Sequence, residues 1–131
     1  MPTLPLLTDD QASPQARAVF DDIRAKRGTE YVNNFWRVLA NDPPLLAATW
    51  ERLQQVMAPG ALDPLVKEML YVAVSVANGC SYCVHFHTAA ARAKGMNPAM
   101  QGELMAVIAM ASQTNALATA MQVEVDDRFK V

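Results

Sequence analysis

Four side chains able to transfer protons or electrons lie within eight consecutive residues of this chain, from Cys80 to His87. The segment reads "CSYCVHFH" and holds both cysteines and both histidines of the 131-residue sequence. Such a cluster is typical of a redox-active dithiol, of a metal site, or of a buried helix in which these residues only pack. The spacing of the residues and the elements around them decide among the three.

Cys80 and Cys83 have the spacing of a redox dithiol at the start of a helix. Residues three apart share one face of a helix, so the two sulfurs can come within bonding distance. The unpaired N–H groups of the first turn lower the pKa of a thiol there, which favours Cys80 as the more acidic one. His87 follows Cys83 by one turn and can accept its proton, which favours Cys83. A redox pair is expected on either count.

Glu68 is a candidate third member of this group. Lys67 and Glu68 are the two charged residues between positions 64 and 91. If the chain turns near residue 78 and runs back antiparallel, a rise of about 1.5 Å per residue places Glu68 nearly level with His87. The carboxylate can then orient the imidazole and stabilise its charged form. Spacing leaves another role equally open, in which Glu68 pairs with a lysine or reaches solvent.

A zinc site is the main chemical alternative. Cys80, Cys83 and His87 can supply three ligands, with Glu68 or His85 as the fourth. Structural zinc usually joins loop-rich segments through a second pair of ligands far along the chain, and this sequence has no such pair. We therefore expect no metal, and we expect His85, which lies two residues from each partner, to have a packing or hydrogen-bonding role on another face.

The elements that must position these residues are helices. Four dipeptides combine a good N-cap residue with a proline, which suits the first helical position: Ser13-Pro14, Asp42-Pro43, Asp63-Pro64 and Asn97-Pro98. Three more helices are expected, from Ser81 to Lys94, over residues 31–41, and from the segment 112–115 towards Val125, which would end the preceding helix near Ala111. No strand-like alternation competes, so the sequence predicts an all-α bundle of about six to seven helices, with Cys-x-x-Cys at the N-terminus of a central helix.

The helix expected after Asp63 carries two apolar stripes side by side. One comprises Leu65, Met69, Val72 and Val76, and the other Val66, Leu70, Ala73 and Ala77. A helix apolar over so much of its surface belongs at the centre of a bundle. The chain also has more hydrophobic surface than one small bundle readily hides, so we expect a homo-oligomer.

Composition limits the partners. Hydrophobic residues make up 52% of the chain and the formal net charge is −2, without the basic face that nucleic-acid binding needs. The N-terminal segment lacks the features of a signal peptide, and the uncharged stretch 69–91 is interrupted by an Asn-Gly turn, so no membrane span is expected. We expect a cytoplasmic protein, in whose reducing surroundings a Cys-x-x-Cys pair is catalytic or metal-binding more often than structural.

Glu68, Cys80, Cys83 and His87 match the pattern Glu-x11-Cys-x2-Cys-x3-His. In this respect the chain resembles the AhpD-like alkylhydroperoxidases of the carboxymuconolactone decarboxylase superfamily. The resemblance covers roughly residues 30–125 as the core of a single domain over 1–131, with residues 1–29 as a variable extension carrying one helix. It implies an AhpD-like helical fold assembled as trimers or hexamers.

The resemblance further implies a thiol-dependent antioxidant oxidoreductase that reduces organic hydroperoxides or passes electrons to a peroxiredoxin. Cys83 would attack the peroxide, Cys80 would be the resolving and partner-facing thiol, and His87 with Glu68 would relay protons. A lipoyl-type or other thiol donor would restore the dithiol, and no cofactor is required. Tyr82, a possible accessory residue, stands where the best-described branch has a histidine, and a phenol does not relay protons near neutral pH as an imidazole does.

A second function class stays open on the sequence alone. The chain could be a non-enzymatic module that binds a ligand or a partner, with the dithiol as a redox sensor or as inert packing. Peroxide consumption that depends on Cys83 separates the two.

Overall fold

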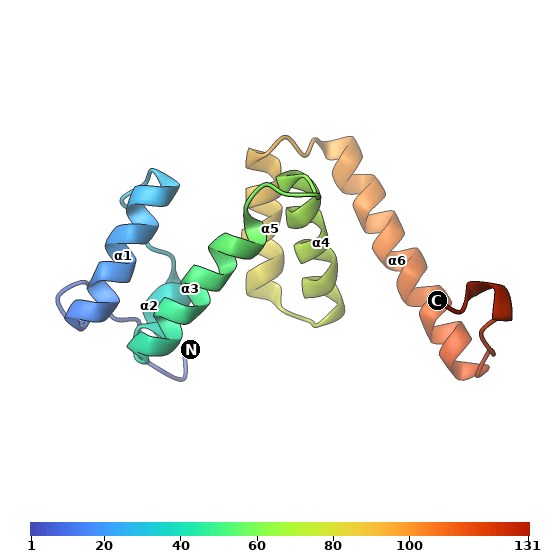
Figure 1. Cartoon of the computed structure of the whole chain (residues 1–131), viewed down its shortest axis with the longest axis horizontal. Coiled ribbons are helices and arrows are strands. Elements are labelled where there is room, and N and C mark those ends of the chain that lie inside the picture. Colours follow the sequence, from blue (N-terminus) through green and yellow to red (C-terminus); the bar gives the residue numbers. More distant parts are fainter. The chain divides into compact units, whose positions relative to one another are not determined.

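The structure is a computed structural model that describes all residues, Met1–Val131, and it is built from helices (Figure 1). The elements are α1 (Pro14–Arg27), α2 (Asn34–Leu39), α3 (Pro43–Met57), α4 (Pro64–Ala77), α5 (Ser81–Ala93), α6 (Pro98–Ala120) and a short 3-10 helix, η1 (Asp127–Phe129). No strand forms, so the all-α prediction is confirmed. The chain comprises two compact units, Met1–Ala58 and Pro59–Val131. The assignment of residues 1–131 to a single domain, with an extension over 1–29 and a core over 30–125, stays a prediction.

Side-chain caps confirm the four predicted helix starts. In each case a side-chain oxygen of the residue before the proline accepts an N–H of the first turn, and the proline begins the helix. The capping residues are Ser13, Asp42, Asp63 and Asn97. These starts are set by local chemistry, which is why the sequence pattern locates them.

The first unit has a tryptophan-centred core. The rings of Trp36 and Trp50 meet edge to face, with centroids 5.3 Å apart, among buried side chains of α1 and α3 such as Phe20 and Leu46. Trp50 Nε1 donates a hydrogen bond of 2.7 Å to Asp22 Oδ2, so the polar edge of its indole is satisfied. These contacts join α1, α2 and α3.

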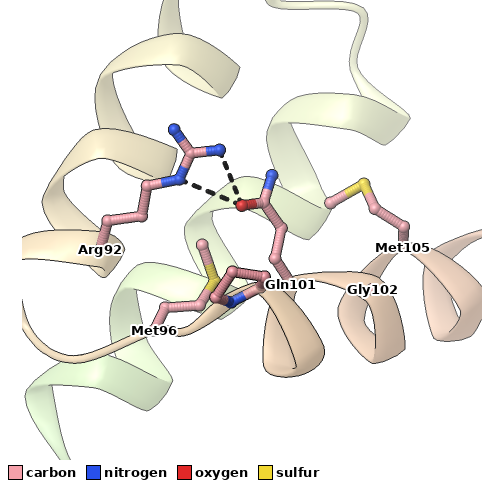
Figure 2. Close-up of a pocket in the computed structure, with 6 residues that line it drawn as sticks. Arg92, Met96, Gln101, Gly102 and Met105 are labelled. Carbon is pink, nitrogen blue, oxygen red and sulfur yellow. Dashed lines mark hydrogen bonds between the residues drawn. The ribbon is translucent and has the colours of Figure 1, made fainter.

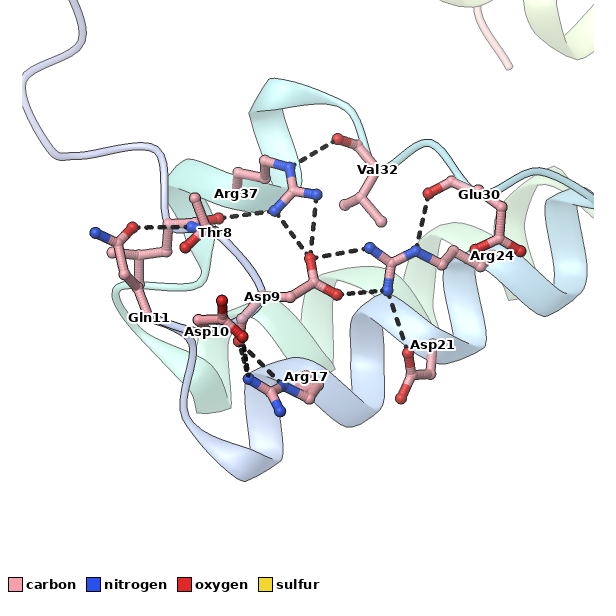
Figure 3. Close-up of polar contacts among 11 residues, drawn as sticks. Thr8, Asp9, Asp10, Gln11, Arg17, Asp21, Arg24, Glu30, Val32 and Arg37 are labelled. Carbon is pink, nitrogen blue, oxygen red and sulfur yellow. Dashed lines mark hydrogen bonds and ion pairs between the residues drawn. The ribbon is translucent and has the colours of Figure 1, made fainter.

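Asp9 anchors the segment before α1 to two helices of the first unit (Figure 3). Its Oδ2 lies 2.7 Å from Arg24 Nη1, and its Oδ1 lies 3.2 Å from Arg37 Nη2. The hydrogen bond from Arg24 is the main reason that the pKa of Asp9 lies below its ordinary value. Arg37 also donates to the Leu7 and Val32 carbonyls, so one ionic cluster fixes the path of the chain around α2.

In the second unit, α4 and α5 form a helical hairpin, side by side in Figure 1. The connection is short because Gly79 takes a left-handed conformation, with φ of 68°, and the N–H of Cys80 donates back to the Ser75 carbonyl at 2.9 Å. Val72, Ala91, Met96 and Leu104 form the buried core, which brings α6 against α4. The predicted turn at Asn78-Gly79 is confirmed.

α6 runs without interruption from Pro98 to Ala120, so the helix boundary predicted at residues 112–115 is wrong. Residues 112–115 include neither proline nor glycine, so nothing in these four residues prevents the helix from continuing. The Thr114 hydroxyl donates to the Met110 carbonyl at 3.0 Å, a contact that a threonine makes inside a helix.

One of the two apolar stripes of α4 is exposed in this chain. Val72 is fully buried, whereas Val66 and Leu70 are 41% and 51% exposed. The predicted central position of α4 is thus only partly realised in the single chain, because α5 and α6, the helices that pack on it in this unit, cover its other faces and leave Val66 and Leu70 exposed. No helix of the structure has both the length and the apolar composition to cross a bilayer.

Candidate functional site

The two cysteines lie together at the start of α5. Cys80 is the N-cap residue, and its Sγ accepts the N–H of Cys83 with an N···S distance of 3.3 Å. The Cys83 side chain also hydrogen-bonds to Cys80, and both residues are free cysteines that are partly buried. The sulfurs are therefore close neighbours, as the three-residue spacing predicts.

The surroundings separate the acidities of the two thiols. Hydrogen bonds from the Cys83 side chain and then from its N–H lower the pKa of Cys80 below its ordinary value. Burial, followed by the neighbouring Cys80, raises the pKa of Cys83 to about 11. Cys80 is thus the more acidic thiol of the pair, in agreement with the helix-terminus argument. Because the pKa of Cys83 lies well above neutral pH, rapid chemistry at this thiol needs a base.

Glu68 and His87 meet between α4 and α5. His87 Nδ1 lies 2.7 Å from Glu68 Oε2, and the two residues are only 7% and 5% exposed. Their predicted level positions on antiparallel helices are confirmed by this contact, while their catalytic roles stay predictions.

A lysine occupies the other oxygen of the same carboxylate. Lys94 Nζ donates to Glu68 Oε1 at 3.1 Å. Burial raises the pKa of Glu68, but hydrogen bonds from His87 and Lys94, with the charge of Lys94, outweigh it, so the pKa lies below its ordinary value of 4.5. The ionised carboxylate accepts the Nδ1 proton, which leaves the lone pair of His87 on Nε2. Both contacts that the spacing left open for Glu68, one with His87 and one with a lysine, are therefore present together.

Aromatic rings fix the plane of the imidazole. Tyr71 stacks on His87 with a centroid distance of 3.6 Å and an interplanar angle of 20°, and Phe86 meets it edge-on at 5.0 Å. Burial and then the charges of Cys83, Glu68 and Cys80 raise the pKa of Tyr71, because its phenol lies close to the same cluster.

The sequence pattern did not single out Tyr71 or Lys94. A signal for both was present, since Tyr71 follows Glu68 by three residues and Lys94 follows His87 by seven, which places each on the same helical face as its neighbour in the site. Listing the side chains that share a helical face with Glu68 or His87 would therefore have included both residues.

The side chains of two other candidates from the sequence are exposed. His85 is exposed, in agreement with its expected position on another face of α5. Tyr82 is 42% exposed. No three or more His, Cys, Asp or Glu side chains are grouped so as to hold a metal ion, so the zinc alternative has no ligand set in this structure.

An open pocket of about 550 Å³ lies where α5 leads into α6 (Figure 2). Arg92 donates to Gln101 Oε1 from Nε at 3.1 Å and from Nη2 at 2.8 Å, and Met96 and Met105 supply apolar lining. None of the thiol-cluster side chains lines it, so this pocket is distinct from the candidate site.

The family model described as "Carboxymuconolactone decarboxylase family" matches residues 43–124, a span that includes the whole cluster and more than half of the chain. The chain belongs to the carboxymuconolactone decarboxylase family. A curated family relative, "Alkyl hydroperoxide reductase AhpD" of Solibacter usitatus, is 34% identical over 91 residues, which are 70% of this chain and 50% of the relative. The chain thus spans about half the length of that curated relative.

A solved structure confirms the fold that the family signature predicts. The crystal structure of the alkylhydroperoxidase AhpD core from Rhodospirillum rubrum is 60% identical and superposes with a TM-score of 0.96, covering 100% of this chain and 98% of that one. The resemblance to AhpD-like proteins and the AhpD-type helical fold are both confirmed, with the Cys80–Cys83 pair at the start of α5.

Proposed function

We propose that the chain is a thiol-dependent peroxidase that reduces organic hydroperoxides through a Cys80–Cys83 dithiol–disulfide cycle. The observation that carries this proposal is the buried Glu68–His87 hydrogen bond on the same helical hairpin as two adjacent free thiols. The names of the AhpD relatives, an alkyl hydroperoxide reductase and an alkylhydroperoxidase, support the same chemistry.

In the first half of the proposed cycle, Nε2 of His87 takes the proton of the Cys83 thiol and the sulfur attacks the terminal peroxide oxygen. The S–O bond forms as the O–O bond breaks, and the departing alkoxide takes the proton back from His87. The products are an alcohol and a sulfenic acid at Cys83. Cys80 then attacks this sulfur, the S–S bond forms, and water leaves.

Cys83 is assigned the attacking role because it precedes the base His87 by one helical turn, and once that base removes its proton the thiolate of a high-pKa thiol is intrinsically strongly nucleophilic. Burial is the first cause of its raised pKa of about 11, whereas burial is the last of the causes acting on Cys80. Cys80, the less desolvated sulfur, is then the one that a reductant thiol attacks, and Cys83 leaves as a thiolate that takes up, through His87, the proton that the reductant releases. Glu68 holds the imidazole and stabilises its charged form throughout.

The disulfide must be reduced by an external thiol, and we propose a lipoyl-type dithiol or another small thiol donor. A peroxiredoxin that takes electrons from the Cys80 side of the pair is the other partner consistent with this cycle. Either route needs a reducing compartment, which supports a cytoplasmic location.

We further propose that the chain forms a homo-oligomer, a trimer or hexamer. Exposed apolar side chains on two helices support this proposal, because monomers rarely leave such surface uncovered. They are Val66, Leu70 and Val74 on α4 and Met105, Val107, Met110 and Leu117 on α6. Light scattering at micromolar concentration should give a multiple of the 14.3 kDa chain mass, and a monomeric mass would contradict the proposal.

Peroxide turnover with a dithiol donor tests the enzymatic proposal. We expect the wild type to consume cumene hydroperoxide, the Cys83→Ser variant to lose this activity, and a His85→Gln control to retain it. Equal, slow consumption by wild type and Cys83→Ser would refute the peroxidase and favour the non-enzymatic module with a redox-sensing dithiol.

A further inference from the structure

The two oxygens of the Glu68 carboxylate contact two different residues, His87 of α5 and Lys94, the C-cap residue of that helix. Oε2 lies 2.7 Å from His87 Nδ1, and Oε1 lies 3.1 Å from Lys94 Nζ. His87 and Lys94 are seven residues apart, which is two helical turns, so both lie on the face of α5 that meets α4. One carboxylate therefore links an imidazole and an ammonium group.

The burial of Glu68 distinguishes this pair from an ordinary surface ion pair. Glu68 is 5% exposed, whereas 41% of the Lys94 side chain is exposed. A carboxylate removed from water needs a compensating charge or hydrogen bonds to stay ionised. Lys94 supplies a charge at the edge of the site while its stem reaches inward.

The other titratable groups around the pair do not replace this charge. On α4, Tyr71 stacks on His87, and Lys67, which precedes Glu68, projects from a different side of the helix, about 100° around the axis. On α5, the thiols of Cys80 and Cys83 add negative charge when ionised. The single charged residue of α6, Glu103, is exposed. Lys94 is thus the cation whose contact with the carboxylate the structure shows.

We propose that Lys94 is a positioning residue, which keeps Glu68 ionised and directed at Nδ1 of His87 so that Nε2 is free to accept the Cys83 proton near neutral pH. A carboxylate paired with an imidazole alone draws a proton onto the ring, and a protonated ring accepts nothing from a thiol. Lys94 counters this by sharing the carboxylate charge. The inference rests on the proposed thiol chemistry and adds the residue that sets its pH range.

The test compares Lys94→Met with the conservative Lys94→Arg and with Arg92→Met as a matched control. Arg92 lies in the same last turn of α5 and carries the same charge, but its guanidinium bonds Gln101 instead of Glu68 (Figure 2). Two readouts are needed: the titration of the Glu68 carboxyl by carbon-13 NMR, and the pH–rate profile of Cys83 alkylation by iodoacetamide, resolved by peptide mass spectrometry. Neither uses peroxide.

In Lys94→Met we expect the pKa of Glu68 to rise, the acid limb of the Cys83 profile to move to higher pH, and the rate at pH 7 to fall about tenfold. Lys94→Arg should restore both readouts, and Arg92→Met should change neither. Unchanged profiles in Lys94→Met, or an equal shift in Arg92→Met, would overturn the inference. If neither the wild type nor any variant consumed peroxide, the proposed peroxidase activity would be refuted. The carboxyl titration and the alkylation profile would still decide the role of Lys94.

Discussion

His87 and Glu68 are 19 residues apart in the sequence, yet Nδ1 of one lies 2.7 Å from Oε2 of the other in a buried contact. The contact exists because the hairpin of α4 and α5 turns at Gly79 and returns both side chains to the same level. It gives the imidazole a fixed orientation and a charged partner beside the thiols, and it is the feature from which the proposed chemistry is built.

Substituting Glu68 by glutamine should slow the reaction of Cys83 with peroxide by at least about tenfold. The amide oxygen of the introduced glutamine can still accept the Nδ1 proton, but it carries no charge to stabilise an imidazolium. The measurement is kcat/KM for cumene hydroperoxide, with Glu103→Gln on exposed α6 as the control. A Glu68→Gln rate equal to that of wild type would remove Glu68 from the proposed relay.

Removing Cys83 should raise the pKa of Cys80, whereas removing Cys80 should lower the pKa of Cys83. In Cys83→Ser the pKa of Cys80 should rise, because the hydrogen bond from the Cys83 side chain is the largest cause of its lowering. In Cys80→Ser the pKa of Cys83 should fall from about 11 yet stay above the ordinary 9.0, because burial remains. Thiolate absorbance as a function of pH measures both. A Cys83 pKa at or below 9.0 in Cys80→Ser would show that burial does not dominate.

The lowered pKa of Glu68 predicts a specific loss of stability in acid. A carboxyl whose folded pKa is depressed contributes stability above its unfolded value, ordinarily 4.5, and this contribution is lost as the pH falls through the folded value. The difference in unfolding free energy between wild type and Glu68→Gln should therefore change between pH 6 and pH 3, in the direction that disfavours wild type at low pH. Urea unfolding at several pH values measures it. A constant difference would contradict the depressed pKa.

The stacking of Tyr71 on His87 predicts that the ring matters more than the hydroxyl. Tyr71→Phe keeps the stack and should retain most of the peroxide rate. Tyr71→Leu loses an aromatic contact of about 0.5–1.5 kcal/mol and leaves the imidazole less well oriented, so its rate should fall. Comparing kcat/KM for the two variants checks this. An equal loss in both would assign the effect to the phenol.

Those parts of the fold that depend on local chemistry could be predicted from the sequence. Ser13, Asp42, Asp63 and Asn97 cap their helices through contacts within one turn, so the residue types alone locate four helix starts. The continuous α6 was missed because polar residues such as Thr114 are compatible with both a helix boundary and a helix interior.

The site was partly predictable for the same reason. Helical rise alone brings Glu68 level with His87, but it does not determine how far each helix is rotated about its axis. That rotation places Tyr71 on the imidazole and Lys94 on the second carboxylate oxygen. Likewise, periodicity shows that Val66 and Leu70 share an apolar stripe with Ala73 and Ala77, but it does not show which surface covers that stripe.

Mass spectrometry of differentially alkylated thiols, before and after one equivalent of cumene hydroperoxide, tests the proposed peroxidase cycle most directly. We predict that the reduced protein carries two free thiols and that peroxide converts them to a Cys80–Cys83 disulfide, whereas Cys80→Ser stops at a sulfenic acid on Cys83. Two thiols left free after exposure to peroxide, or oxidation first trapped on Cys80, would contradict it.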